Sequence, residues 1–197
     1  MRTDLDKLLD FIKFTHELRK IKRQIVLDDD QNENDAEHSY QMAMLAMFII
    51  DENNLNLDRY RCMAMALVHD VIEVYAGDLI VFAPQKELVD KAAREQEAVE
   101  QLAQDWPNIS SLHELIEEYE ERKTPEAKFV YALDKLIPEI NNYLYGGKAW
   151  KKHGIKVEQV KEVKKGKVDI NPTIGNYHKQ IIKLIEANPE LFRKVAK

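Results

Sequence analysis

The sequence predicts an all-α fold, a helical bundle that forms a single domain. Only six glycines and six prolines interrupt the chain. Apolar residues recur mostly at spacings of three and four, the period of an amphipathic helix, and no segment shows convincing strand alternation. The length of 197 residues falls within the usual size of one domain and allows a core without disulfide or zinc staples. We therefore expect one domain over residues 1–197.

Two helices are expected in the first quarter of the chain. The first runs from about Thr3 to Lys20, and a polar loop that looks solvent-exposed follows at 28–35. Asn34, followed three residues later by Glu37, is a capping-box pattern that starts the second helix and places His38 in its first turn. The apolar residues of the first helix lie broadly on one side: Leu5, Leu8, Leu9, Ile12 and Phe14.

A third helix is expected from about Leu57 to Tyr75, ended by Gly77. Its segment 62–68 has no polar side chain, so this helix should lie in the centre of the domain. Further helices are expected at about 85–104, at 111–122, and from a cap at Thr124 to Leu144. Residues 146–197 should comprise a glycine- and lysine-rich surface excursion, to about Pro172, and a last helix at about 174–187.

The composition indicates in which cellular compartment the protein works and which partners it binds. Cys62 is the single cysteine, so no intrachain disulfide can form, which fits a reducing compartment. The first residues lack the apolar run of a signal peptide, and no stretch approaches the roughly 20 apolar residues that span a bilayer. We therefore expect a cytoplasmic protein that binds no membrane. A net charge of −6 argues against a nucleic-acid partner and leaves room for a small anionic molecule at a locally basic spot such as 19–23.

The first indication of chemistry is the dipeptide His69-Asp70, which directly follows the most apolar segment. A carboxylate there would cost several kcal/mol unless a metal ion or a basic residue from another helix pairs with it. Glu73 lies four residues after His69 on one helix face, and Asp78 follows just beyond Gly77. An isolated His-Asp dipeptide is more often a hydrogen-bonded pair in a core, so the dipeptide alone does not indicate a metal site.

Two other residues show related anomalies. His38 lies near a helix start, where the helix dipole disfavours protonation and leaves an imidazole nitrogen free to coordinate. Asp134 places a carboxylate within an apolar helical stripe, as Asp70 does. Together with His69 and Asp70 they form a set of two imidazoles and two carboxylates suited to Zn, Mn, Fe or Co, with open positions for water and substrate. Periodicity does not show that these residues converge.

Four segments match an HD-domain pattern in order and approximate spacing: 36–40 (AEHSY), 66–73 (ALVHDVIE), 77–78 (GD) and 133–136 (LDKL). The chain resembles the branch of HD hydrolases that contains the 5′-deoxynucleotidases, and segments 118–120 and 124–130 add to the similarity. This motif-bearing core covers about residues 18–145. The resemblance implies an HD-type helical bundle.

The resemblance also implies roles for individual residues. His38, His69, Asp70 and Asp134 match the family's metal ligands, while Glu73 and Asp78 match residues that serve the catalytic step. Arg23 matches an arginine that contacts the substrate phosphate, although the tryptophan that usually follows it is replaced here by the run Gln24-Ile25-Val26. A homodimer is implied as well.

One divalent ion is expected, either Co, Mn, Zn, Fe or Mg. Enzymes of this superfamily with two metals need further histidines between the His-Asp pair and the last aspartate, and only His113, in a charged segment typical of a surface, lies there. The expected function is that of a metal-dependent phosphohydrolase, a 5′-nucleotidase that releases phosphate from deoxynucleoside 5′-monophosphates. The alternatives are a triphosphohydrolase, whose extra cations the segment 148–167 could supply, another phosphoesterase of the HD superfamily, a di-metal oxygenase, and a non-catalytic helical binding protein.

Overall fold

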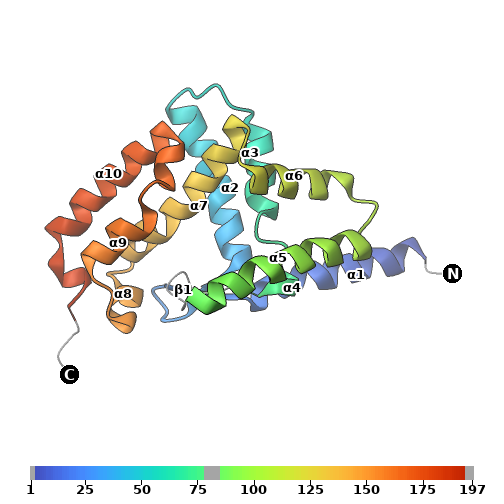
Figure 1. Ribbon diagram of the computed structural model, residues 1–197, viewed down its shortest axis with the longest axis horizontal. Coiled ribbons are helices and arrows are strands. Elements are labelled where there is room, and N and C mark those ends of the chain that lie inside the picture. Colours follow the sequence, from blue (N-terminus) through green and yellow to red (C-terminus); the bar gives the residue numbers. More distant parts are fainter. Residues whose placement is uncertain (1–2, 78–84, 194–197) are drawn as a thin grey trace.

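The computed structural model describes residues 3–77 and 85–193, and it confirms an all-helical fold (Figure 1). The N-terminal half contains α1 (Asp4–Glu17), α2 (Asp35–Glu52), α3 (Arg59–Val68), α4 (Glu73–Ala76) and α5 (Gln85–Asp105). The C-terminal half contains α6 (Ser110–Glu121), α7 (Pro125–Leu144), α8 (Lys148–His153), α9 (Val157–Lys164) and α10 (Pro172–Ala187). None of the helices described is long and apolar enough to cross a bilayer.

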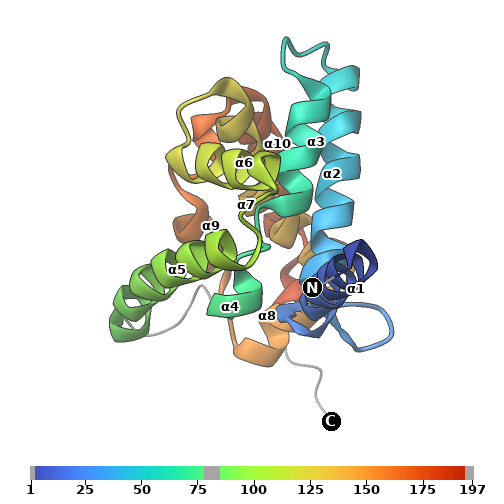
Figure 2. The same ribbon diagram turned by 90° about the vertical axis from the view of Figure 1, so that its right-hand side faces the viewer.

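Helix α7 is the central element of the larger core. It lies between the pair α2 and α3, which pack side by side, and the C-terminal helices α8–α10 (Figures 1 and 2). Residues on several of its faces are buried, among them Phe129, Leu133, Leu136 and Ile137, each with no exposed surface. A smaller core joins α1, α4, α5 and α6 around Phe14 and Leu102. The candidate residues on α2, α3 and α7 are thereby held on three helices that meet.

A short antiparallel hairpin precedes α2, although no strand was expected. Strand β1 (Lys22–Val26) pairs with β2 (Asn32–Asn34). The expectation that 28–35 is an exposed loop holds for the turn but is wrong for Glu33, Asn34 and Asp35, which are buried. The hairpin folds this polar segment against the protein because Asn32 Nδ2 donates to the Arg23 carbonyl at 2.6 Å and the Asn34 cap then leads directly into α2.

The expected third helix is wrong in two respects. It breaks after Val68, and α4 begins only at Glu73, because the amides of Val71 and Glu73 bond carbonyls three residues back and tighten the chain into turns. Helix α3 also lies at the surface rather than in the centre, since Leu67 is 48% exposed. The central position belongs to α7.

The segment 145–172 is more ordered than an extended surface excursion. It forms α8, α9 and a 3-10 turn at Val168–Ile170, and these pack on α7. Trp150, Val160 and Val168 bury their side chains there. The glycines do not mark a loop here. Gly147 and Gly154, both with positive φ, cap the two ends of the six-residue helix α8.

Candidate metal centre

The start of α2 places His38 inside the protein. Asn34 Oδ1 accepts the Glu37 amide at 3.1 Å, and the Glu37 carboxylate accepts the Asn34 amide at 3.0 Å, so the expected capping box is present. His38 therefore lies in the first turn of the helix, fully buried. Its Nε2 is 3.1 Å from Asp134 Oδ1 on α7.

The end of α3 orients His69. Its Nδ1 lies 2.9 Å from the Ala66 carbonyl oxygen, which can only accept, so Nδ1 carries a proton and donates it. The Nε2 atom then faces two carboxylates, Asp70 Oδ2 at 3.1 Å and Asp134 Oδ1 at 3.8 Å. A backbone carbonyl that fixes the tautomer in this way is the usual support of a metal-binding histidine.

Asp134 joins the two histidines at the buried side of α7. Tyr119 donates its hydroxyl hydrogen to Asp134 Oδ2 at 3.1 Å, and Lys135 Nζ donates to the same oxygen at 2.5 Å. Burial raises the pKa of Asp134, but Lys135 and the two imidazoles outweigh burial and hold this pKa well below its usual range. Asp134 is therefore ionised at neutral pH.

The two imidazoles differ in the charges that surround them. Burial and the positive charge of Arg23 lower the pKa of His38 to about 4, so this ring is neutral. Burial also lowers the pKa of His69, but the carboxylates of Asp70 and Asp134 outweigh it and raise this pKa to about 10. Two carboxylates thus demand positive charge at His69 Nε2, which either a proton or a metal ion can provide.

The donor set suits a divalent metal. One potential ligand atom from each of His38, His69 and Asp134 lies within 4.8 Å of the other two, and all three residues are buried. Two imidazole nitrogens with carboxylate oxygen match Zn, Mn, Fe or Co. Asp70 borders the same group through its contact with His69 Nε2. The structure thus brings together all four residues that the sequence suggested as ligands.

Arg23 reaches the same centre from β1. Its Nη1 donates to Asp70 Oδ2 at 2.8 Å and to Asp35 Oδ1 at 3.2 Å, and its Nη2 is 3.8 Å from Asp134 Oδ1. The Arg23 guanidinium therefore neutralises carboxylates of the centre in this structure. Contact between Arg23 and a substrate phosphate stays a prediction.

A cavity of about 370 Å³ opens onto this centre. Glu73 lies in its wall, 7% exposed, as the first residue of α4. Asp78, the other expected catalytic acid, lies outside the described residues. The lining combines metal-centre residues, acids, cations and one tyrosine besides Tyr119: His69, Asp70, Ile72, Glu73, Glu95, Tyr119, Glu120, Arg122, Tyr131, Asp134, Lys135, Lys164 and Lys167.

A family model described as HD domain matches residues 15–174, most of the chain and all of the centre. The chain belongs to the HD-domain family. The match reaches beyond residue 145, where the motif-bearing core was expected to end, and includes the short helices α8 and α9. The HD domain of this chain thus contains Lys164 and Lys167 as well as the four candidate ligands.

Proteins with curated names share the HD domain. The human protein named 5′-deoxynucleotidase HDDC2 is 37% identical over 134 residues, 65% of this chain and 63% of that protein. The zebrafish protein of the same name is 34% identical over 145 residues, 72% of this chain and 70% of that protein. The alignment with the human protein thus spans less than two thirds of its length.

Solved structures show the same architecture. A protein from Magnetospirillum magnetotacticum, described as a predicted metal-dependent phosphohydrolase, superposes with a TM-score of 0.80 at 28% identity, covering 98% of this chain and 100% of that one. A conserved hypothetical protein from Pyrococcus furiosus superposes with a TM-score of 0.58 at 22% identity, covering 91% of this chain and 99% of that one. The second likeness concerns the fold alone.

Two buried acids of this HD domain were not expected from the sequence. Glu33 and Asp35 flank the Asn34 cap, and both approach Arg23, Glu33 Oε2 at 3.5 Å and Asp35 Oδ1 at 3.2 Å. Burial raises the pKa of Glu33 to about 7, although Arg23 and the Asn141 amide, which donates at 2.9 Å, act in the opposite direction. The one sequence feature that could have indicated their burial is their position on either side of the Asn34 helix cap.

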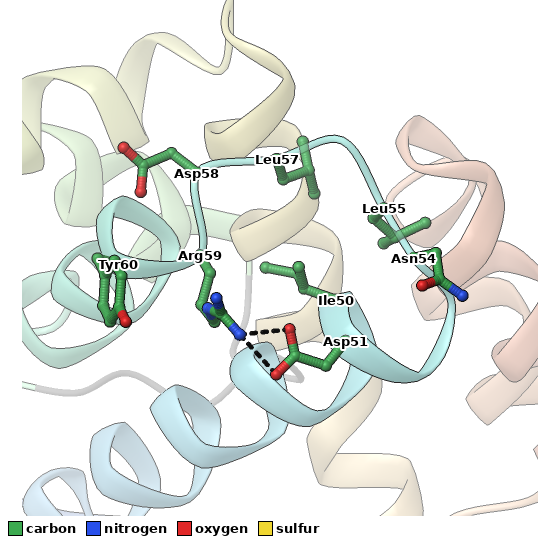
Figure 3. Close-up of a pocket in the computed structure, with 8 residues that line it drawn as sticks. All are labelled: Ile50, Asp51, Asn54, Leu55, Leu57, Asp58, Arg59 and Tyr60. Carbon is green, nitrogen blue, oxygen red and sulfur yellow. Dashed lines mark hydrogen bonds and ion pairs between the residues drawn. The ribbon is translucent and has the colours of Figure 1, made fainter.

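His113 and a second hollow lie apart from the metal centre. His113 is half-buried rather than exposed. Its Nε2 contacts the Trp106 carbonyl oxygen at 2.9 Å, and the residue does not line the cavity. A second hollow lies between the end of α2 and the start of α3 (Figure 3), where Arg59 donates to both oxygens of Asp51 at 2.6 and 2.7 Å. This hollow has no candidate metal ligand in its lining.

Proposed function

We propose that this HD-domain protein is a metal-dependent phosphohydrolase, a 5′-nucleotidase that releases phosphate from deoxynucleoside 5′-monophosphates. The observation that carries the proposal is the buried group of His38, His69 and Asp134 in direct continuity with a cavity that contains both acids and cations. The names of the curated relatives support the choice of substrate.

One divalent ion, either Co, Mn, Zn, Fe or Mg, would be held by His38, His69, Asp70 and Asp134. Such an ion supplies Lewis-acid activation of water and of the phosphoryl group. The chain supplies the remaining functions. Glu73, in the cavity wall, accepts the proton of the attacking water. Tyr119 and Lys135 fix the Asp134 carboxylate in one orientation, and Arg23 Nη1 donates a hydrogen bond to Asp70 Oδ2 at 2.8 Å.

The charge of the cavity favours a monophosphate over a triphosphate. Among the described residues, five carboxylates and four basic side chains line it, so a divalent ion brings the net charge of this part of the lining to plus one. A phosphate monoester carries about −1.5 to −2 at neutral pH. A triphosphate carries more negative charge and would leave a larger excess uncompensated. Lys164 and Lys167, which belong to the segment 148–167, favour the triphosphohydrolase alternative, but the five acids offset them.

The first experiment measures phosphate release from a panel of deoxyribo- and ribonucleoside 5′-monophosphates. The protein is stripped with chelator, and Co²⁺, Mn²⁺, Zn²⁺ or Mg²⁺ is added back. We expect release that depends on metal, favours the deoxy substrates and is absent from His69→Ala. Deoxynucleoside triphosphates are assayed in parallel for release of intact triphosphate. Triphosphate release without phosphate release would replace the nucleotidase by the triphosphohydrolase.

We also propose a homodimer. Four apolar residues of α1 are exposed, between 39% and 61%, although their spacing is that of a packed helix face: Leu5, Leu8, Leu9 and Ile12. On α2, Tyr40, Met44 and Phe48 form a second exposed stripe. Exposed apolar surface of this extent is typical of sites where proteins associate.

A further inference from the structure

Lys164 is a buried cation that the mechanism above does not use. It is the last residue of α9, only 9% exposed, and it lines the cavity at the metal centre. Among the described residues none forms an ion pair with Lys164 within 4.0 Å. A lysine is rarely buried to this degree without a paired charge.

The residues around Lys164 add positive charge rather than a negative partner. Lys135 and Lys167 line the same cavity, so three ammonium groups share one site. Burial and the charge of Lys135 lower the pKa of Lys164 to about 8, and the same two causes lower the pKa of Lys167. An anion between these groups would relieve the repulsion and replace the lost solvation.

A purely structural role for Lys164 would need a carboxylate beside it. Glu139 on α7 is the buried acid that acts most strongly on its charge, followed by Asp134. Glu139 Oε2 lies 3.3 Å from His178 Nε2 on α10. Asp134 is bound directly by Lys135 and Tyr119. Neither acid forms an ion pair with Lys164.

The distribution of charge within the cavity shows where an anion would bind. Three of the four basic residues of the lining, Lys135, Lys164 and Lys167, come from α7, from α9 and from the turn after α9. Glu73, Glu95 and Glu120 come from α4, α5 and α6, and the fourth basic residue, Arg122, follows α6 on this acidic side. Arg23 is not part of the cavity lining. An anion that approaches His69 and Asp134 along the side formed by α7 and α9 therefore meets lysines.

We propose that Lys164, assisted by Lys167, binds the phosphoryl group of the substrate and of the released inorganic phosphate. This proposal rests on the proposed phosphohydrolase function and specifies the anion subsite of the same cavity. Neither residue lies in the motifs that define the HD centre. Two ammonium groups beside the candidate metal ligands offer charge-assisted hydrogen bonds to a phosphate dianion.

The test is the affinity of inorganic phosphate for the metal-loaded protein, measured by calorimetric titration, together with the KM for the best monophosphate. Lys164→Met keeps the length of the side chain and removes the charge. The matched control is Lys165→Met, the same change at the next residue, which is exposed and outside the cavity. Lys164→Arg tests whether a positive charge restores binding. Metal stoichiometry and thermal unfolding are recorded for every variant.

We expect Lys164→Met to weaken phosphate binding and raise KM roughly tenfold to a hundredfold, as for the loss of a hydrogen bond to a charged group. The metal stoichiometry should not change. Lys165→Met should match the wild type, and Lys164→Arg should recover most of the affinity. Unchanged phosphate affinity in Lys164→Met, or no phosphate binding by the wild type, would overturn the proposal. Phosphate binding that depends on Lys164 in a protein that hydrolyses no nucleotide would support the subsite and refute the proposed function.

Discussion

Glu73 is the single residue on which the proposed mechanism depends most. It begins α4 immediately after the turn 69–72, so its carboxyl group enters the cavity beside His69 and Asp70. If Glu73 accepts the proton of the attacking water, Glu73→Ala and Glu73→Gln should both lower turnover by about 10²- to 10⁴-fold, the usual contribution of a general base. Metal stoichiometry should be preserved, because Glu73 is not among the candidate ligands.

The matched control for this change is Glu121→Gln, which removes an exposed carboxylate paired with Lys123 at 2.7 Å. Its turnover should equal that of the wild type. Equal turnover of Glu73→Gln and wild type would remove Glu73 from the mechanism. Loss of the metal in Glu73→Gln would instead assign Glu73 to the metal centre.

Single residues were predictable where burial of a polar group contradicts the local pattern. His69, Asp70 and Asp134 could be found because each interrupts an apolar stretch, and His38 because of its place behind a cap. Glu33 could not, since it lies in a polar segment whose burial depends on the hairpin fold. The burial of Lys164 was not predicted for a related reason. In a lysine-rich segment, the sequence does not distinguish a buried lysine from the exposed lysines around it.

At the scale of elements, the cap of α2 connects helix stability to the metal centre. Asn34 and Thr3 both form capping boxes, but Asn34 is 7% exposed and precedes His38, whereas Thr3 is exposed at the start of α1. Asn34→Ala should lower the free energy of unfolding by about 1 kcal/mol, the typical value of an N-cap. It should also weaken metal binding about tenfold, since residues that orient ligands commonly contribute this much.

Thr3→Ala is the control for this prediction, because it removes an equivalent cap from a helix that carries no candidate ligand. It should leave metal affinity unchanged and reduce stability by no more than Asn34→Ala does. Denaturant unfolding measures the first effect and competitive metal titration the second. If Asn34→Ala bound metal as tightly as the wild type, the cap would not be needed to hold His38 in place.

Elements were predictable where caps and periodicity agree. The start of α2 and the bounds of α5, α6 and α7 lie within a few residues of those expected. An N-cap marks two of the starts, Asn34 before α2 and Thr124 before α7, where Pro125 is the first helical residue. The hairpin was missed because β2 has only three residues, too few for alternation to be visible. Helix α8 was missed because its flanking glycines, which serve as helix caps, also occur in loops. Helix α9, capped by Lys156 and Lys165, has only eight residues.

At the scale of the whole molecule, the apolar stripes of α1 and α2 are not covered by any other part of the described chain. Phe14 and Leu18 fix the end of α1 in the smaller core, while Leu5, Leu8, Leu9 and Ile12 remain exposed. Helix α1 lies near the start of α2 (Figure 2), and the dimer that we propose uses both stripes in one contact. A stable dimer usually buries about 1,200–2,000 Å² in total, an area that one helix stripe alone would hardly provide.

We therefore expect the wild-type protein to sediment as a dimer and the double variant Leu8→Glu/Phe48→Glu to sediment as a monomer, since two carboxylates would be desolvated in the interface. The control is Lys13→Glu, which changes the net charge by the same amount at a site where the lysine is 76% exposed. It should stay dimeric. Circular dichroism must show unchanged helicity in both variants. A monomeric wild type would refute the dimer, and a dimeric double variant would place the interface outside these two stripes.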